Sequence, residues 1–160
     1  MAYLGQLDNL VHEADRGKAI RNTQTIAVFG DGLVICAVSV ATGGRPVAPW
    51  RWWRPARASR PGGRGDGNEV GRIAAELGAG ADAAALAQAW PRAELIPAAV
   101  IESVVLERPR QVTRLTITEE RLRSGEQASS VFLGDISGRT ARDLLGPVLG
   151  GRLQIDLPAD

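Results

Sequence analysis

Two groups of side chains include residue types that could carry out covalent or metal chemistry. Cys36 is the only cysteine and could act as a nucleophile, but His12, the only histidine, is far away in the sequence. Asp8 and His12 would share one face of a helix and could bind a metal ion. One histidine among carboxylates is more typical of a solvated helix face, and a cysteine in the apolar run LVICAVS is more typical of a core residue. We therefore expect no catalytic residue, no metal site, no cofactor and no enzymatic activity.

Two glycine-rich stretches resemble phosphate-binding loops in composition. Residues 63–67 read GRGDG, and residues 78–83 read GAGADA, which matches the pattern G-x-G-x-x-A. Neither stretch follows a predicted strand, so the strand–turn–helix geometry that binds a dinucleotide phosphate is not expected. Lys18 is the sole lysine, which leaves no lysine for a phosphate-binding P-loop.

The segment 45–64, called the Arg/Trp segment below, is the most unusual part of the sequence. It holds six arginines, three of the four tryptophans and no acidic residue, so its charge is +6. The rest of the chain holds 13 basic and 18 acidic side chains, a net charge of −5. Guanidinium groups bind phosphates and carboxylates in a bidentate manner, and tryptophan offers an amphipathic ring. The binding residues that we predict are Arg51, Trp52, Trp53, Arg54, Arg57 and Arg60.

Three interpretations of the Arg/Trp segment remain open at this point. An anionic membrane or an acidic protein partner would attract the arginines, and tryptophan is common at the headgroup level of a bilayer. Single-stranded nucleic acid would stack its bases on the tryptophans. Alternatively, the tryptophans pack on the rest of the fold and the arginines only solvate a linker.

Composition indicates one soluble globular domain over residues 1–160. The chain is 44% hydrophobic and 23% charged, with a formal net charge of +1. No window approaches the roughly 18 apolar residues that span a bilayer, and the N-terminus lacks the basic and apolar regions of a secretory signal. We expect a cytoplasmic protein, with peripheral contact at the inner membrane face if the Arg/Trp segment binds lipid.

The first forty residues predict a helix followed by a hairpin. Apolar residues recur with a helical period in residues 4–20, which predicts an N-terminal helical extension over residues 1–22; these residues are Leu4, Leu7, Val11 and Ala14. Residues 24–40 contain two β-branched runs on either side of Gly30-Asp31-Gly32. This pattern predicts a β-hairpin, in which both glycines tolerate positive φ.

The middle of the chain predicts a long loop and then two short helices. Residues 42–68 contain many prolines and glycines without apolar periodicity, which indicates a loop. Residues 69–90 predict a helical insertion, in which Asp82 caps the second helix and Pro91 stops it.

From residue 94 the apolar period shifts towards two. We expect strands over residues 101–106, 114–118 and 130–134, the first entered through Pro97, and a helix over residues 138–149. The expected core consists of Ile26, Val28, Leu33, Ile35, Ile101, Val104, Leu106, Leu115, Ile117, Val131, Leu133, Leu144, Leu145 and Val148.

The C-terminal part of the chain resembles the bacterial pleckstrin-homology-like (PH-like) domains. The runs LIPAAVIESVVLER, LTITEE and VFLGDISGRTARDLLGPVLGGRL follow the order of motifs in that family. The resemblance covers residues 94–153. It covers the hairpin around Gly30-Asp31-Gly32 only loosely, and residues 1–22 and 42–90 have no counterpart. It implies an α+β fold, an antiparallel curved sheet or barrel closed by a C-terminal helix, with a helical insertion after the first hairpin. It carries over no catalytic residues.

Together these observations predict a non-catalytic binding module. It would recruit a protein partner or an anionic surface through the Arg/Trp segment. Two alternatives remain: a homo-oligomeric assembly protein, joined through an open sheet edge or the N-terminal helix, and a weak nucleic-acid binder that uses the same segment.

Overall fold

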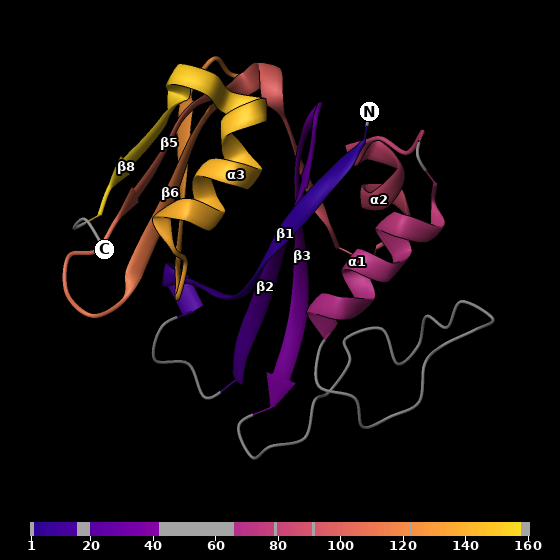
Figure 1. Cartoon of the computed structure of the whole chain (residues 1–160), viewed down its shortest axis with the longest axis horizontal. Helices are drawn as coiled ribbons and strands as arrows, with labels where there is room; N and C mark the ends of the chain where they lie inside the picture. The colour runs from indigo at the N-terminus through magenta and orange to yellow at the C-terminus, as the bar shows by residue number, and fades with distance from the viewer. Residues whose placement is uncertain are drawn as a thin grey trace.

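In the residues that it describes, the computed structural model has an α+β fold with one eight-stranded sheet and three α-helices (Figure 1). It describes residues 2–15, 20–41, 66–78, 80–90, 92–121 and 123–157. The strand order is β4-β3-β2-β1-β7-β6-β5-β8, and every neighbouring pair is antiparallel except β5 and β8. The strands are β1 (Tyr3–His12), β2 (Ile20–Phe29), β3 (Gly32–Ala41), β4 (Glu94–Pro97), β5 (Ile101–Glu107), β6 (Thr113–Glu120), β7 (Gln127–Gly134) and β8 (Leu153–Asp156).

The sheet consists of two halves that meet at two corners. At one corner, the 3-10 helix η2 (Ala98–Val100) separates β4, which pairs with β3, from β5, which pairs with β6. At the other corner, β1 pairs with β7 only at Val11–Leu133 and His12–Phe132. The hydrogen-bonded order nevertheless ends at β4 and β8, so these two edges are not joined into a closed barrel.

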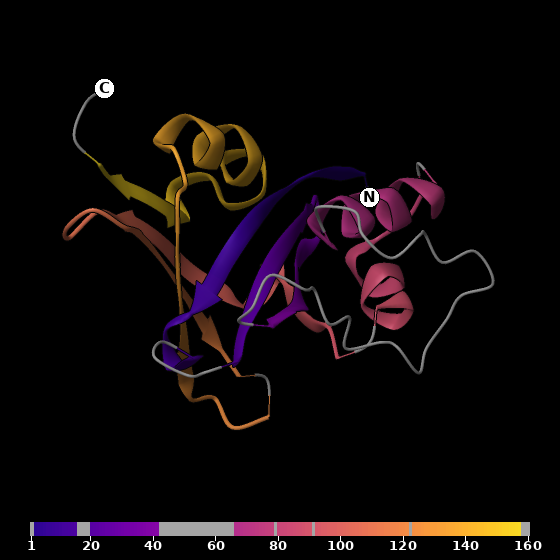
Figure 2. The same ribbon diagram turned by 90° about the horizontal axis from the view of Figure 1, so that it is seen from below.

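The main core lies where the two halves of the sheet face helix α3 (Gly138–Leu149). Figure 2 shows the halves diverging with α3 in the angle between them. Ser137 caps the helix, because its Oγ accepts a hydrogen bond from the Thr140 N–H at 3.1 Å. The backbone of β1 comes so close to α3 that a Cβ on Gly5 would lie 2.6 Å from Leu144 Cδ2. The buried residues of this core are Leu7, Leu10, Ile26, Val28, Leu33, Ile35, Ile96, Ile101, Val104, Leu106, Leu115, Ile117, Phe132, Ile136, Ala141, Leu145 and Leu149.

A second core forms on the opposite face of β2 and β3, under helices α1 (Asp66–Glu76) and α2 (Ala83–Ala89). The two strands are covered on both faces over their paired segments 26–29 and 33–36, which explains why both segments are continuously apolar. Trp90 is buried here, and its Nε1–H donates to the Ala37 carbonyl at 3.4 Å. The Asp31 carboxylate in the hairpin turn accepts from the Ala83 N–H at 3.3 Å, which fixes the start of α2.

Several expectations are confirmed. The hairpin forms with a two-residue turn, the helical insertion contains α1 and α2, and β5, β6 and β7 are neighbours followed by α3. The role of the turn glycines differs, since neither adopts a positive φ. Gly32 is instead required by close packing, because a Cβ there would lie 2.7 Å from the Ile96 carbonyl oxygen.

The expected N-terminal helix is wrong, since residues 3–12 form strand β1. A bulge between Leu7 and Leu10 places two residues of β1, Asp8 and Asn9, opposite a single residue of β2, and Asn9 has φ +58°. Both leucines therefore point into the core at a spacing of three, which imitates a helical period. This strand also removes the N-terminal helix as a route to self-association.

Two details of the expected core are also wrong. Phe132 is buried, whereas Val131 and Leu133 are only half-buried on the other face of β7. All three residues are apolar, so alternation alone does not decide which face is inward. On α3 the buried stripe runs through Leu145 and Leu149, and Leu144 and Val148 only flank it. The remaining core predictions are confirmed.

Arg152 fastens α3 to the corner between β4 and β5. Its Nη1 donates to the carbonyls of Ala98 at 2.6 Å and Ile101 at 2.7 Å. Nη2 donates to the Val148 carbonyl at 3.2 Å, and Nε donates to the Leu149 carbonyl at 3.3 Å. A cation is well placed here, because the last carbonyls of a helix have no partner within it.

We expect Arg152→Ala to lower the free energy of unfolding by about 2–4 kcal/mol. The substitution removes the donor of four charge-assisted hydrogen bonds and leaves the accepting backbone carbonyls without this partner. Urea denaturation measures this, with Arg142→Ala on the exposed face of the same helix as the control. A loss for Arg152→Ala no larger than that of the control would contradict the role of this side chain.

Candidate functional site

The six predicted binding residues lie outside the described residues. They fall between the end of β3 at Ala41 and the start of α1 at Asp66. The loop expected over residues 42–68 is shorter at its C-terminal end, since residues 66–68 belong to α1. Both flanking ends lie at the same end of the fold (Figure 1). Strand β3 and helix α1, which flank the undescribed residues, both pack in the second core, where Cys36 of β3 and Val70 of α1 are fully buried.

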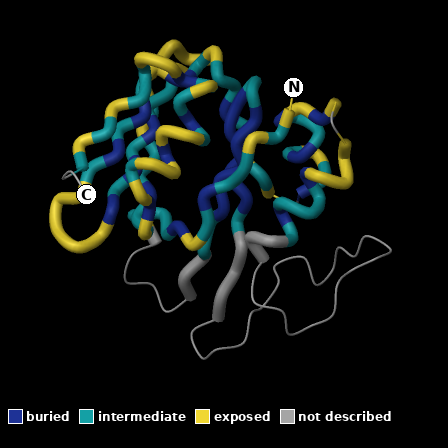
Figure 3. The backbone as a smooth tube through the Cα atoms, in the orientation of Figure 1, coloured by how far each residue is buried: buried dark blue, intermediate teal, exposed yellow. Residues whose placement is uncertain are grey.

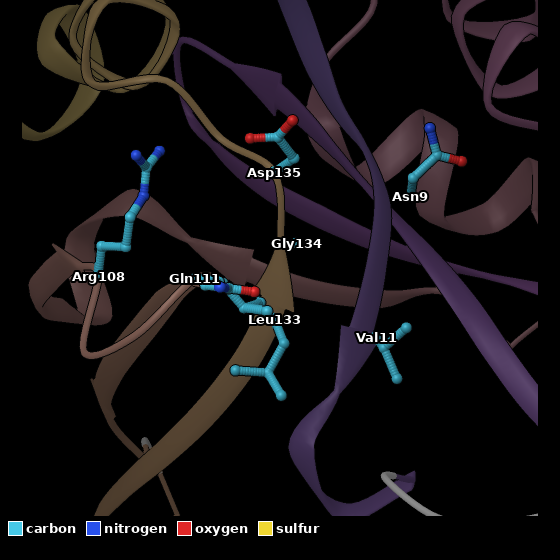
Figure 4. A pocket seen from close by; sticks show the side chains of 8 residues that line it. Asn9, Val11, Arg108, Gln111, Leu133, Gly134 and Asp135 are labelled. Carbon is cyan, nitrogen blue, oxygen red and sulfur yellow. The ribbon is translucent and has the colours of Figure 1, made fainter. Parts of the chain in front are cut away.

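Among the described residues, a hollow of about 590 Å³ opens at the corner between β1 and β7 (Figure 4). Its wall comes from the bulge of β1, the turn between β5 and β6, and the end of β7. The site is open to solvent, since Figure 3 shows the β5–β6 turn as one continuous exposed stretch. The lining residues are Asn9, Val11, Arg108, Gln111, Val112, Leu133, Gly134 and Asp135.

Local structure holds the three parts of this hollow together. Thr113 pairs with Gly134 at the end of the ladder, and its Oγ1 donates to the Ile136 carbonyl at 3.3 Å. Gly134 permits close contact with β1, because a Cβ there would lie 2.6 Å from Leu10 Cδ2. The β5–β6 turn is therefore fixed against the chain that leaves β7.

The hollow combines two opposite charges, two amides and an apolar patch. Arg108 and Asp135 are exposed, and no ion pair joins either one to another described residue. Val112 is 47% exposed, the most of the three large hydrophobic side chains that are exposed in the described part of the chain. Cysteine, serine, threonine, histidine and lysine are missing from the lining.

Sequence analysis did not identify the hollow because its residues come from three distant segments. Arg108, Leu133, Gly134 and Asp135 fall within the runs that resemble the PH-like family, but that resemblance carries no binding residues to these positions. A signal exists only in the polar residues just after strands, at Arg108 and Asp135, and these are ordinary turn residues. The lining residues of β1 and of β7 come together only because these two strands pair at the corner. The sequence analysis predicted a helix in residues 4–20 and therefore did not predict this pairing.

A polar network lies on the other face of β1, beneath α1. The Tyr3 hydroxyl donates to Gln6 Oε1 at 2.7 Å, and Gln6 Nε2 donates to both Asp8 oxygens at 2.9 Å. Thr25 Oγ1 donates to Asp8 Oδ1 at 2.9 Å. Gly71 of α1 packs directly on this network, since a Cβ there would lie 2.8 Å from Gln6 Oε1. The Asp8 carboxylate thus links β1 to β2, and Gln6 of the same network packs against α1.

The structure separates the residues considered for covalent and metal chemistry. Asp8 belongs to this network, whereas His12 stacks edge-on against Phe132 with ring centroids 5.2 Å apart. Within the described ranges, no group of three or more potential ligands could hold a metal ion. Cys36 is fully buried, and burial raises the pKa of its thiol to about 12, so it is protonated at neutral pH. The prediction that Cys36 is a core residue is confirmed.

Comparison of the chain with protein-family models and with curated proteins gave no match. Over the described ranges, none of the helices has the length and apolar character needed to cross a bilayer. The proposals below rest on the residues and contacts themselves.

We expect the free energy of unfolding to fall as pH rises from 9 towards 12. Burial raises the pKa of Cys36 from 9.0 to about 12, and burial, followed by the charge of Asp8, raises the pKa of Tyr3 from 10.0 to about 12. The unfolded chain therefore releases protons at a lower pH than the folded chain, which favours unfolding in this range. Cys36→Ala should make the decline with pH less steep in urea denaturation. An identical slope in the variant and the wild type would contradict the buried, protonated thiol.

Proposed function

We propose that the chain is a non-catalytic binding module with a PH-like fold. It recruits a protein partner or an anionic surface through the Arg/Trp segment, and an anionic lipid surface is the partner that its composition favours. Its contact residues are Arg51, Trp52, Trp53, Arg54, Arg57 and Arg60.

The order and bending of the strands support the PH-like part of the proposal. A hairpin and β4 form one half of the sheet, a three-stranded meander forms most of the other, and the C-terminal helix packs between them. The run Glu94–Glu107, which carries one of the resembling motifs, contributes to both halves through η2. A bent sheet with a C-terminal helix packed on it supports the PH-like part of the proposal, and the hydrogen-bonded order is open at β4 and β8.

The observation that carries the functional part is the separation of charge along the chain. Residues 45–64 have a charge of +6, and the rest of the chain has a charge of −5. Each basic residue near an anionic bilayer contributes about 1 kcal/mol, and tryptophan rings add favourable contacts at the headgroup level. The described elements on either side of the segment in the sequence, β3 and α1, both contribute residues to the second core.

Co-flotation with liposomes tests this function. The full chain should float with vesicles that contain phosphatidylserine and should not float with purely phosphatidylcholine vesicles, and the binding should weaken as salt increases. A Trp52→Ala/Trp53→Ala/Arg54→Ala variant should lose most of the binding, because it removes aromatic contacts together with a charge.

A pair of charge variants separates the segment from net charge. Arg51→Ala/Arg54→Ala/Arg57→Ala changes the charge by the same amount as a control with three exposed arginines elsewhere replaced, namely Arg121, Arg123 and Arg142. Only the first should lose flotation. Equal binding by both variants, or binding to single-stranded DNA but not to anionic vesicles, would reject the lipid-surface proposal.

A further inference from the structure

The hollow at the β1–β7 corner holds two opposite charges that face the same space without meeting. Figure 4 shows the guanidinium of Arg108 and the carboxylate of Asp135 extending to the same side of the end of β7. No ion pair joins them, and each lacks an ion-pair partner elsewhere in the described part of the chain. The volume between the lining residues, about 590 Å³, leaves room for a ligand that contacts both groups.

The chemistry of the lining selects the class of ligand. A guanidinium binds a carboxylate through two parallel hydrogen bonds, and a carboxylate accepts hydrogen bonds from an ammonium group. A ligand that carries both charges can pair with Arg108 and Asp135 at once, whereas a ligand with a single charge can form only one of these ion pairs. The amides of Asn9 and Gln111 each offer donors and an acceptor, which match the N–H and C=O of a peptide group.

The apolar part and the size of the hollow narrow the class further. Val11, Val112 and Leu133 form a patch that a small aliphatic side chain can cover. A volume of about 590 Å³ is typical of pockets for small molecules, roughly 300–1,000 Å³, and exceeds what one amino acid needs. A short peptide with both termini free combines all of these features.

The backbone of β1 supplies an independent indication. Asn9 is one of two non-glycine residues with a positive φ in the described part of the chain, and it lies in the bulge between Leu7 and Leu10. Bulges redirect side chains and are common beside binding sites. Here the bulge turns β1 away from the regular ladder at the point where the hollow opens.

We propose that this hollow binds short zwitterionic peptides, with Arg108 holding the C-terminal carboxylate and Asp135 the N-terminal ammonium group. The site shares no residue with the Arg/Trp segment. It therefore adds a second, separate binding activity to the one proposed above.

Titration of the ¹⁵N-labelled full chain with the dipeptide leucyl-alanine tests this site by NMR. Backbone amides of Gln111, Val112 and Asp135 should shift together and saturate. Acetylation of the peptide's N-terminus or amidation of its C-terminus should each weaken binding about tenfold, since each removes one ionic contact.

Single substitutions then assign the two contacts. Arg108→Ala should weaken binding of the free dipeptide, but should make little difference to the amidated form. Asp135→Asn should likewise weaken binding of the free dipeptide, but should make little difference to binding of the acetylated form. Both residues are exposed, so the fold should persist, and Arg121→Ala at the far end of β6 is the control.

Three results would overturn the proposal: no localised shifts with the dipeptide, equal shifts with acetate alone, or unchanged affinity in the Arg108 and Asp135 variants. None of these results bears on flotation with anionic vesicles. Conversely, loss of flotation in the Arg/Trp variants leaves the dipeptide titration unaffected, so the two proposals fail independently.

Discussion

Pro97 ends β4, and the three residues after it turn the chain so that β5 joins the other half of the sheet. A single apolar run thus pairs with β3 through its first part and with β6 through its second. The two halves of the sheet therefore join at η2 and diverge from it, with a shared core between them (Figure 2). Helix α3 occupies the angle between the halves, and the four hydrogen bonds from Arg152 hold its last turn against the corner.

The central hairpin β2–β3 then carries two different surfaces. Its inner face contributes Ile26 and Val28 to the core around α3, and its outer face contributes Ala27 and Phe29 to the core beneath α1 and α2. The helical insertion is therefore an integral layer of the fold. Both β3 and α1, the described elements that flank residues 42–65 in the sequence, contribute to that layer. The hollow lies at the second corner of the sheet, between β1 and β7.

Periodicity predicted the elements whose cores are regular. The hairpin, the strands β5, β6 and β7, and α3 were predicted, because their apolar residues follow periods near two and 3.6. The short strand β8 was not predicted. Periodicity failed at β1, where the bulge at Asn9 gives a strand the spacing of a helix. It also failed at Val131 and Leu133, since Phe132 between them is equally apolar. The hollow could not be predicted, because it depends on a corner between strands more than a hundred residues apart.

The central structural claim is that both halves of the sheet share one core around α3. Native-state hydrogen exchange of Leu145→Ala tests it most directly, because Leu145 is buried on α3 within that core and truncation should cost roughly 2–5 kcal/mol. The account predicts that the most protected amides of β2–β3 and of β5–β6 lose protection by the same amount. Loss confined to β5–β6, with wild-type protection in β2–β3, would show that the halves are stabilised separately and would contradict the account.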